Sequence, residues 1–205
     1  MKNLQNRYSL LEENGWVNKT FIYSINKEGF RSNEFKDNTD IMFLGCSNTF
    51  GVGLPENNTW PYLLSEKLKN SFVNLGVPGG SLKTVFRMLH GWADKLNPKI
   101  VIILSPPEAR TEVMTSQREF KQYILHLELA KFGEYGRHYI IDEHNLELDT
   151  LIFRLSIERI CNLKKIKLIY LPRWVGDSTD LARDLSHYGV KSNLTMADLI
   201  LQNYF

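Results

Sequence analysis

Four short, mainly apolar runs constrain the fold of this chain more than any other feature. They are Ile41–Leu44, Phe72–Leu75, Ile100–Leu104 and Ile166–Tyr170. Runs of this length without strict polar alternation are typical of strands that are buried on both faces of a sheet. The sequence therefore predicts a central sheet with both faces covered.

Helical periodicity between and after these runs predicts what covers the sheet. Thr59 is placed to cap a helix that continues to about Lys69, and Ser81 opens a second helix in which apolar residues recur every three or four positions. Further helices are expected over residues 117–132, 149–163 and 192–203. Strands that alternate with helices predict a three-layer α/β/α fold with a central parallel sheet. Such sheets bind ligands beyond the carboxyl ends of their strands.

Residues 1–40 are polar and aromatic, with a short alternating piece at Thr20–Ser24. We expect an irregular N-terminal extension that packs on the domain and contains one small hairpin at most. Residues 41–205 are then expected to form a single domain, since a chain of this length can bury one full core.

Composition excludes several classes of protein and site. With 25 Lys+Arg against 23 Asp+Glu, the net charge of +2 gives no global field for nucleic acid or an anionic membrane. No apolar run is long enough to span a bilayer, and the first residues lack the apolar stretch of a secretory signal, which predicts a cytoplasmic protein. Cys46 and Cys161 are too few for a disulfide scaffold or a cysteine-built zinc site, and the histidines show no metal-ligand spacing, so no metal is predicted.

Three segments at predicted loop positions carry candidate chemistry. Ser47 lies in Gly45–Gly53, directly after the first apolar run, where a hydroxyl and nearby backbone N–H groups face a cleft. The glycines of Gly76–Ser81 can turn N–H groups outward, as an oxyanion hole requires. Asp184 and His187 can join carboxylate to imidazole and leave Nε2 free to take a proton from a serine. Each segment alone also fits an ordinary turn or a surface coincidence, but together they supply nucleophile, donor and base.

Taken together, these segments resemble the SGNH (GDSL-type) hydrolase superfamily of esterases, lipases and carbohydrate deacetylases. Residues 41–53 are similar to its first block, with Cys46 in place of the usual aspartate. Residues 73–81 are similar to the second block and residues 184–187 to the last. Residues 25–31 also resemble a lead-in seen in a subset of these proteins, so the resemblance covers about residues 25–205.

The resemblance implies a role for each matching residue. Ser47 is the expected nucleophile, His187 the base and Asp184 the residue that orients it. Backbone N–H groups of Ser47, Asn48 and Gly79 are the expected oxyanion-hole donors. No cofactor is expected for this chemistry.

One departure from the family pattern bears on activity. The third block should offer an asparagine just after the third strand, but the chain reads Ser105–Arg110 there, with Pro107 at the matching position. Proline has neither a side-chain donor nor a backbone N–H. Ser105 and Arg110 are the nearby residues that might otherwise supply the donor.

Two main hypotheses follow, and a third stays open. The first is a serine hydrolase that cleaves an ester, such as an O-acetyl group on a carbohydrate. The second is a catalytically weakened SGNH scaffold that serves as a binding or structural module with protein partners in an assembly, for example in a phage virion. The third is a flavodoxin-like FMN protein in which Ser47–Thr49 hold a phosphate, which leaves Asp184 and His187 unexplained. Trp174 is expected either to line a substrate cleft or to pack in the core.

Overall fold

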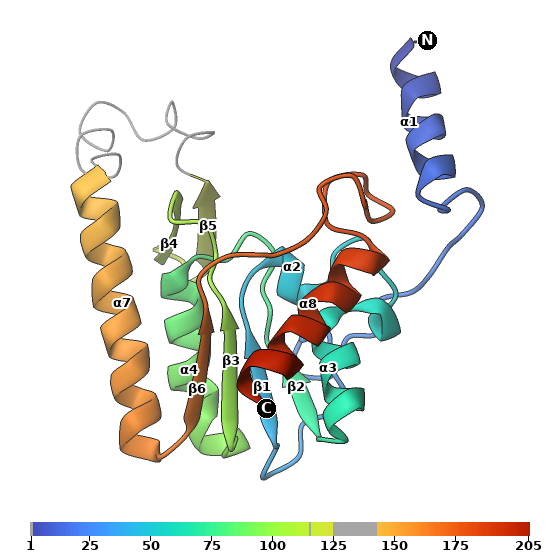
Figure 1. Cartoon of the computed structure of the whole chain (residues 1–205). Coiled ribbons are helices and arrows are strands. Elements are labelled where there is room, and N and C mark those ends of the chain that lie inside the picture. The colour runs from blue at the N-terminus through green and yellow to red at the C-terminus, as the bar shows by residue number, and fades with distance from the viewer. Residues whose placement is uncertain (1, 115, 125–142) are drawn as a thin grey trace.

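The four apolar runs form one parallel sheet in the computed structural model, which describes residues 2–114, 116–124 and 143–205. The strands are β1 (Ile41–Leu44), β2 (Phe72–Asn74), β3 (Ile100–Leu104) and β6 (Lys167–Leu171), in the spatial order β2-β1-β3-β6 (Figure 1). Every neighbouring pair is parallel. The predicted sheet is confirmed, and its strand bounds agree with the predicted ones to within one residue.

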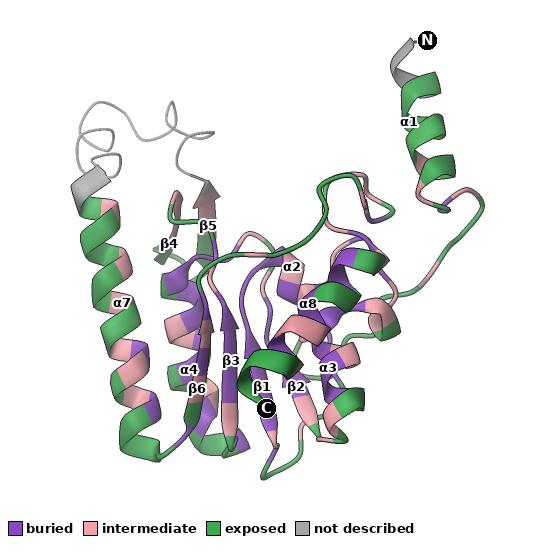
Figure 2. Cartoon of the chain, in the orientation of Figure 1, coloured by how far each residue is buried: buried purple, intermediate pink, exposed green. Residues whose placement is uncertain are grey.

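Helices cover both faces of this sheet, so the predicted three-layer fold class is confirmed. α4 (Leu82–Leu96) and α7 (Glu143–Lys164) pack on one face. α3 (Trp60–Leu68) and α8 (Val190–Tyr204) pack on the other. Figure 2 shows the buried strands between these two layers of helices, whose residues range from buried to exposed. None of the helices in the described ranges combines the length and apolar character that a bilayer crossing needs.

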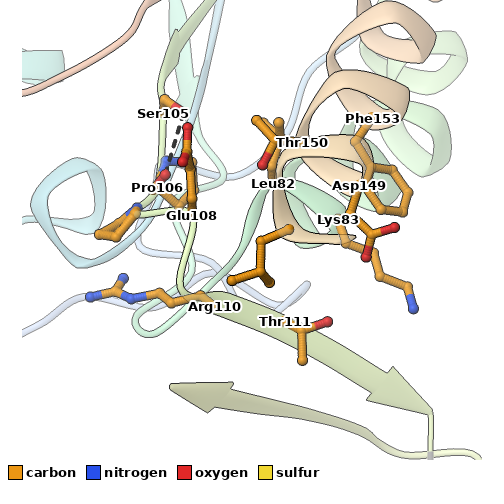
Figure 3. A pocket seen from close by; sticks show the side chains of 12 residues that line it. Leu82, Lys83, Ser105, Pro106, Glu108, Arg110, Thr111, Asp149, Thr150 and Phe153 are labelled. Carbon is orange, nitrogen blue, oxygen red and sulfur yellow. Dashed lines mark hydrogen bonds between the residues drawn. The ribbon is translucent and has the colours of Figure 1, made fainter. Parts of the chain in front are cut away.

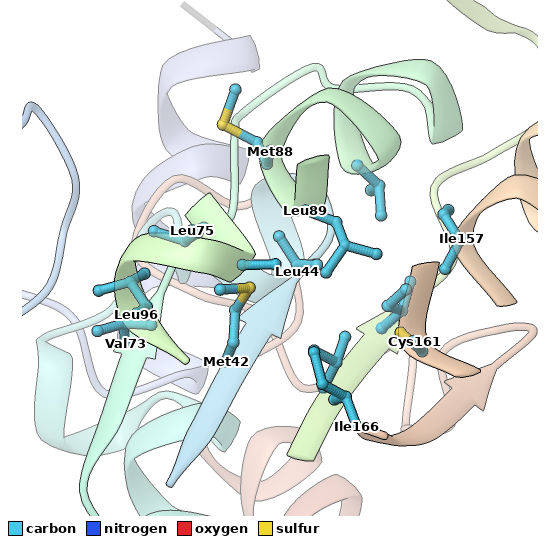
Figure 4. Close-up of a cluster of buried hydrophobic side chains, with 14 of the residues drawn as sticks. Met42, Leu44, Val73, Leu75, Met88, Leu89, Leu96, Ile157, Cys161 and Ile166 are labelled. Carbon is cyan, nitrogen blue, oxygen red and sulfur yellow. The ribbon is translucent and has the colours of Figure 1, made fainter. Parts of the chain in front are cut away.

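Each strand contributes to two cores because successive side chains point to opposite faces of a sheet. In β1, Met42 and Leu44 pack toward α4 and α7 in the cluster of Figure 4, whereas Ile41 and Phe43 pack toward α3 and α8. All four side chains are fully buried. Burying a side chain of this size stabilises a fold by about 1.5–3 kcal/mol. The burial of β1 therefore fixes the position at which the following loop begins.

A local capping signal explains where α4 begins, and α3 begins without one from Thr59. Ser81 caps α4 through a reciprocal pair: its Oγ accepts from the backbone N–H of Thr84 at 3.3 Å, and Thr84 Oγ1 accepts from the N–H of Ser81 at 3.1 Å. α3 begins directly after Thr59, as expected. The Thr59 hydroxyl donates instead to the carbonyl of Glu56 at 2.8 Å, so it makes no side-chain cap.

The helix expected over residues 117–132 is wrong for its described part. β4 (Arg110–Met114) and β5 (Phe120–Ile124) form an antiparallel hairpin there. Long-range contacts override helical periodicity in this segment, because the buried carboxylate of Glu112 binds side chains of α4. Residues 125–132 lie outside the described residues.

Residues 2–13 also differ from the expectation of an irregular extension. They form α1 (Lys2–Glu13), whose described side chains are mostly exposed and which projects away from the sheet in Figure 1. Leu, Gln, Arg and Glu in this stretch have good intrinsic helix propensity, which explains a helix without a buried face. Thr20–Ser24, which is described, does not form a strand, so this piece makes no hairpin.

The rest of the N-terminal extension contacts the domain. Trp16 packs with Leu54 and Ala182, and its Nε1 donates to the carbonyl of Leu181 at 2.8 Å. The short 3₁₀ helix η1 (Glu56–Asn58) follows Leu54. The predicted boundary at residue 40 stays a prediction.

Candidate active site

Ser47 is the first residue of α2 (Ser47–Phe50), a single helical turn that follows β1 through Gly45 and Cys46. It therefore lies at the carboxyl edge of the sheet, where its sequence position predicted it. Its side chain is largely buried, with 7% exposed, and its hydroxyl contacts Cys46 Sγ at 4.0 Å. Cys46 is a free, buried thiol, as expected.

A buried arginine that sequence reasoning did not single out holds the turn after Ser47. Arg31 donates from Nη1 to the carbonyls of Phe50 and Gly51, at 3.1 and 2.6 Å, and from Nη2 to that of Leu54 at 2.6 Å. The side chain is 1% exposed, and burial lowers the pKa of its guanidinium. The only sequence signal for this role was the resemblance of residues 25–31 to a family lead-in.

The structure brings the predicted pair of Asp184 and His187 into contact. Asp184 Oδ2 lies 2.5 Å from His187 Nδ1, and Asp184 Oδ1 accepts the backbone N–H groups of Ser186 and His187 at 3.3 and 3.2 Å. Leu185 between them has a left-handed backbone, with φ of 58°. This tight turn directs the carboxylate at the ring, so Nδ1–H donates to Asp184 and Nε2 is left to accept a proton.

The turn that carries Asp184 packs against the loop that follows Ser47. A Cβ at Gly53 would lie 2.7 Å from Asp184 Oδ1 and 2.8 Å from the Cβ of Ala182. The N–H of Arg183 donates to the carbonyl of Gly53 at 3.0 Å. Gly53 has φ of 80°, so only a residue without a side chain permits this approach. The loop after β1 and the turn before α8, which are far apart in the sequence, therefore meet at one edge of the sheet.

Among the described residues, no hydrogen bond joins Ser47 Oγ to His187, and the partner of that hydroxyl is Cys46 Sγ. In free enzymes the contact between nucleophile and base is often long and tightens when substrate binds. The catalytic role of Ser47 stays a prediction.

The three predicted oxyanion donors are unoccupied by other backbone groups. Within the described part of the chain, the N–H groups of Ser47, Asn48 and Gly79 have no hydrogen-bond acceptor. The Gly79 loop packs beside the Ser47 turn, since the N–H of Val77 donates to the carbonyl of Gly45 at 3.0 Å. Unpaired N–H groups beside a nucleophile are what an oxyanion hole requires, and their role here stays a prediction.

A cavity of about 440 Å³ opens at this edge of the sheet. Its lining comes from the loops after β1, β3 and β6 and includes Cys46, Asn48, Pro107, Arg110, Trp174 and Tyr188. The rings of Trp174 and Tyr188 stack with centroids 4.8 Å apart and planes at 13°. Trp174 lines the cavity and also packs against the core cluster on the α3 and α8 face, so both of its expected positions hold in part. The volume suits a small molecule.

Ser105 and Arg110 were the residues near Pro107 that could supply the missing oxyanion donor, and the structure places them differently. The hydroxyl of Ser105 is paired with Tyr170 Oη at 2.8 Å. Arg110 lines the cavity with its Nη1 buried and without a hydrogen-bond partner among the described residues. In Figure 3 its guanidinium extends away from Asp149 and Phe153, which line a smaller pocket on the other side of the loop.

No family model matches this chain, and no curated protein matches it. Among solved structures it is similar to the esterase EstA from Pseudoalteromonas sp., with 16% identity and a TM-score of 0.44 over 80% of this chain and 96% of that one. It is similar to a family 3 carbohydrate esterase from Clostridium thermocellum, with 16% identity and a TM-score of 0.44 over 81% and 94%. A G-D-S-L lipolytic protein from Veillonella parvula has 16% identity and a TM-score of 0.41 over 80% and 97%. The Veillonella parvula protein is described by the G-D-S-L name that the sequence motifs suggested, and the other two are described as esterases; all three likenesses are distant. The chemistry of this chain therefore rests on its own residues.

Proposed function

We propose that this chain is a serine hydrolase that cleaves carboxylic esters at the carboxyl edge of its sheet, next to the cavity that Cys46 and Asn48, the neighbours of Ser47, help to line. Ser47 is the nucleophile, His187 the general base and Asp184 the residue that orients the imidazole. The observation that carries the proposal is the contact of the Asp184 turn with Gly53, on the loop that follows Ser47. This contact holds the carboxylate–imidazole pair against the loop that begins at Ser47.

The reaction follows from these positions. Ser47 Oγ attacks the acyl carbon while His187 Nε2 takes its proton, and the oxyanion that forms is held by the N–H groups of Ser47, Asn48 and Gly79. The intermediate collapses, and His187 returns the proton to the departing alcohol. Water then attacks the acyl-enzyme, with His187 again as base, and releases the carboxylic acid and free Ser47.

An O-acetyl group on a carbohydrate is the substrate that we propose. The cavity is small, which favours a short acyl group. The stacked rings of Trp174 and Tyr188 offer a flat face on which a sugar ring can lie. Arg110, with its unpaired Nη1, offers a hydrogen-bond donor to the oxygen-rich alcohol part of such a substrate.

Labelling with a fluorophosphonate, which reacts with activated serines, tests the proposal. The wild-type protein should label and Ser47→Ala should not. Mass spectrometry of the labelled peptide should place the adduct on Ser47. Labelling of Ser47→Ala to the same extent as the wild type would remove Ser47 from the mechanism.

One observation favours a second candidate function. Pro107 stands where the superfamily pattern has an asparagine donor, and Ser105 is paired with Tyr170. A scaffold that has lost its activity and acts as a binding or structural module, as in a virion, fits that loss. A protein shown to be folded that fails to label would favour this candidate.

A further inference from the structure

The side chain of Gln122, on β5, covers the loop that carries the predicted oxyanion donor Gly79. A Cβ placed at Gly79 would lie 3.4 Å from Gln122 Oε1 and 4.0 Å from Gln122 Cβ. No described residue exchanges a hydrogen bond with the Gln122 amide, which is half-buried. A polar group that can donate therefore lies next to Gly79 and is free to bind a ligand.

The pairing of the hairpin sets the direction of this side chain. Gln122 lies directly opposite Glu112, and residues opposite each other in an antiparallel pair share one face. Glu112 is 1% exposed and accepts from Nε and Nη2 of Arg87 at 2.7 Å each and from Thr84 Oγ1 at 3.0 Å. Arg87 and Thr84 belong to α4, so the face that carries Gln122 is turned toward α4 and the loop before it.

A second contact holds the same face of β5, the one that carries Gln122, against α4. The guanidinium of Arg87 lies 3.9 Å from the ring centroid of Phe120, two residues before Gln122 and thus on the same side of β5. Thr84 is also half of the reciprocal cap with Ser81, which ends the Gly79 loop. The ion pair, the cation–π contact and the cap together seat the hairpin on the start of α4.

The Gly79 loop is in turn packed on the Ser47 turn. A Cβ at Gly76 would lie 2.5 Å from the backbone nitrogen of Phe50, so the two loops are in close contact. A donor fixed over Gly79 is therefore positioned at the edge of the sheet where the oxyanion forms.

We propose that Gln122 is a catalytic residue whose Nε2 donates to the oxyanion beside the N–H of Gly79. Rotation about the last side-chain bond presents either Nε2 or Oε1 of the amide, and Gln is a residue type that serves this purpose. The hairpin then supplies the side-chain donor that Pro107 cannot. This inference rests on the proposed hydrolase function.

The decisive variant is Gln122→Glu, which keeps the shape of the side chain but has no amide N–H and carries a charge that opposes the oxyanion. Gln122→Ala removes the side chain, and Lys121→Ala changes the exposed neighbour that points to the other face of β5. Each is compared with the wild type and Ser47→Ala by kcat and KM on p-nitrophenyl acetate, endpoint labelling with a fluorophosphonate, and Tm.

We expect kcat of Gln122→Glu and Gln122→Ala to fall by about 10²-fold, because one oxyanion donor typically contributes that much. KM, Tm and endpoint labelling should stay close to wild type, and Lys121→Ala should match the wild type throughout. Wild-type kcat in Gln122→Glu overturns the inference, and so does a loss of kcat matched by a large fall in Tm, which indicates packing. If the wild type hydrolyses and labels while Gln122→Glu is unaffected, only this inference fails. If the wild type does neither, the proposed function fails with it.

Discussion

The loops after β1 and β3 leave the same edge of the sheet from neighbouring strands, yet they are held in opposite ways. The loop after β1 is bound along its backbone by side chains: Arg31 binds three of its carbonyls, and Asn74 Nδ2 donates to the carbonyl of Thr49 at 2.7 Å. The loop after β3 passes through Pro106 and Pro107, which have no N–H to donate. Beyond them, Arg110 Nη1 is buried without a described partner.

The difference shows which loop is built to position an atom and which to meet a ligand. A nucleophile must be held close to its productive geometry, and the buried arginine beneath the Ser47 turn does this. A substrate-facing wall needs groups that are not already engaged, and Arg110, the first residue beyond this loop, lines the cavity with its Nη1 unpaired among the described residues. The following predictions test this contrast, from the largest expected effect to the smallest.

The first prediction compares the two serines that follow these strands. Ser47→Ala should lower kcat on p-nitrophenyl acetate by about 10⁴-fold or more, because removing a nucleophile abolishes covalent catalysis. Ser105→Ala, at the start of the other loop, should retain most of the rate, since its hydroxyl is occupied by Tyr170. Steady-state rates at saturating ester check both. An equal loss of kcat in Ser47→Ala and Ser105→Ala would contradict the assignment of the nucleophile to the loop after β1.

The second prediction concerns the base that faces the loop after β1. His187→Ala should reduce kcat by about 10³-fold or more, because no other group in the turn can take the serine proton. In the wild type, activity should fall in acid, since the protonated imidazole cannot act as a base. His90→Ala, an exposed histidine on α4, is the matched control and should leave the pH profile unchanged. Full activity in His187→Ala would show the acid–base assignment to be wrong.

The third prediction removes the support beneath the Ser47 turn. Arg31→Leu removes the side-chain donor from the carbonyls of Phe50, Gly51 and Leu54, of which only that of Gly51 keeps another donor among the described residues, the N–H of Leu54 at 3.3 Å. Each buried group left unsatisfied costs about 1–3 kcal/mol. Urea unfolding should show a loss of about 3 kcal/mol, and kcat should fall as the turn loosens. Arg154→Leu removes an exposed pair with Glu158 and a cation–π contact with Tyr170, and it should change stability by less than about 1 kcal/mol. Similar losses in the two variants would contradict the special role of Arg31.

Much of the fold was predictable from sequence because buried parallel strands impose a simple pattern. The four runs and the cap at Ser81 required only local information, and the structure confirms them. The described part of the segment 117–132 was misread because β5 pairs with β4, whose Glu112 binds Arg87 of α4, and no local periodicity encodes these contacts. The α1 helix was missed because an exposed helix lacks the apolar stripe by which helices are recognised.

The candidate site divides in the same way. The contact of Asp184 with His187 was predictable because it spans only three residues. The contact of that turn with Gly53 and the bonds of Arg31 join residues far apart in the chain. The proposed role of Gln122 could not be predicted from the sequence. Its segment was predicted to be helical, and only the hairpin of the structure places the amide next to Gly79.

The fourth prediction adds a donor to the poorer loop. Pro107→Asn restores the side chain that the superfamily pattern places after β3, and kcat should rise by less than about tenfold because Gln122 already supplies a donor. In a Gln122→Ala background the same change should restore more of the lost rate, which a double-mutant cycle measures. Strict additivity of the two changes would mean that they do not share one oxyanion.

The smallest expected effect lies at the other ends of the same two strands. Asp40, before β1, binds Lys99, before β3, at 2.7 Å and also accepts from Ser71, and these hydrogen bonds lower the pKa of its carboxyl to about 2. Because the folded pKa lies below the unfolded value of about 3.9, the carboxylate stabilises the fold above that value, and the contribution is lost as the pH falls toward 2. Asp40→Asn should therefore cost less than about 1 kcal/mol at pH 7, since the pair is exposed to solvent, and its difference from wild type in urea midpoint should shrink by pH 3. Its kcat at pH 7 should match the wild type, because this end of the sheet holds the strands together while the opposite end carries the chemistry. A difference in urea midpoint between Asp40→Asn and wild type that grows in acid would contradict the predicted pH dependence. A fall in kcat would show that the two ends of the sheet are coupled.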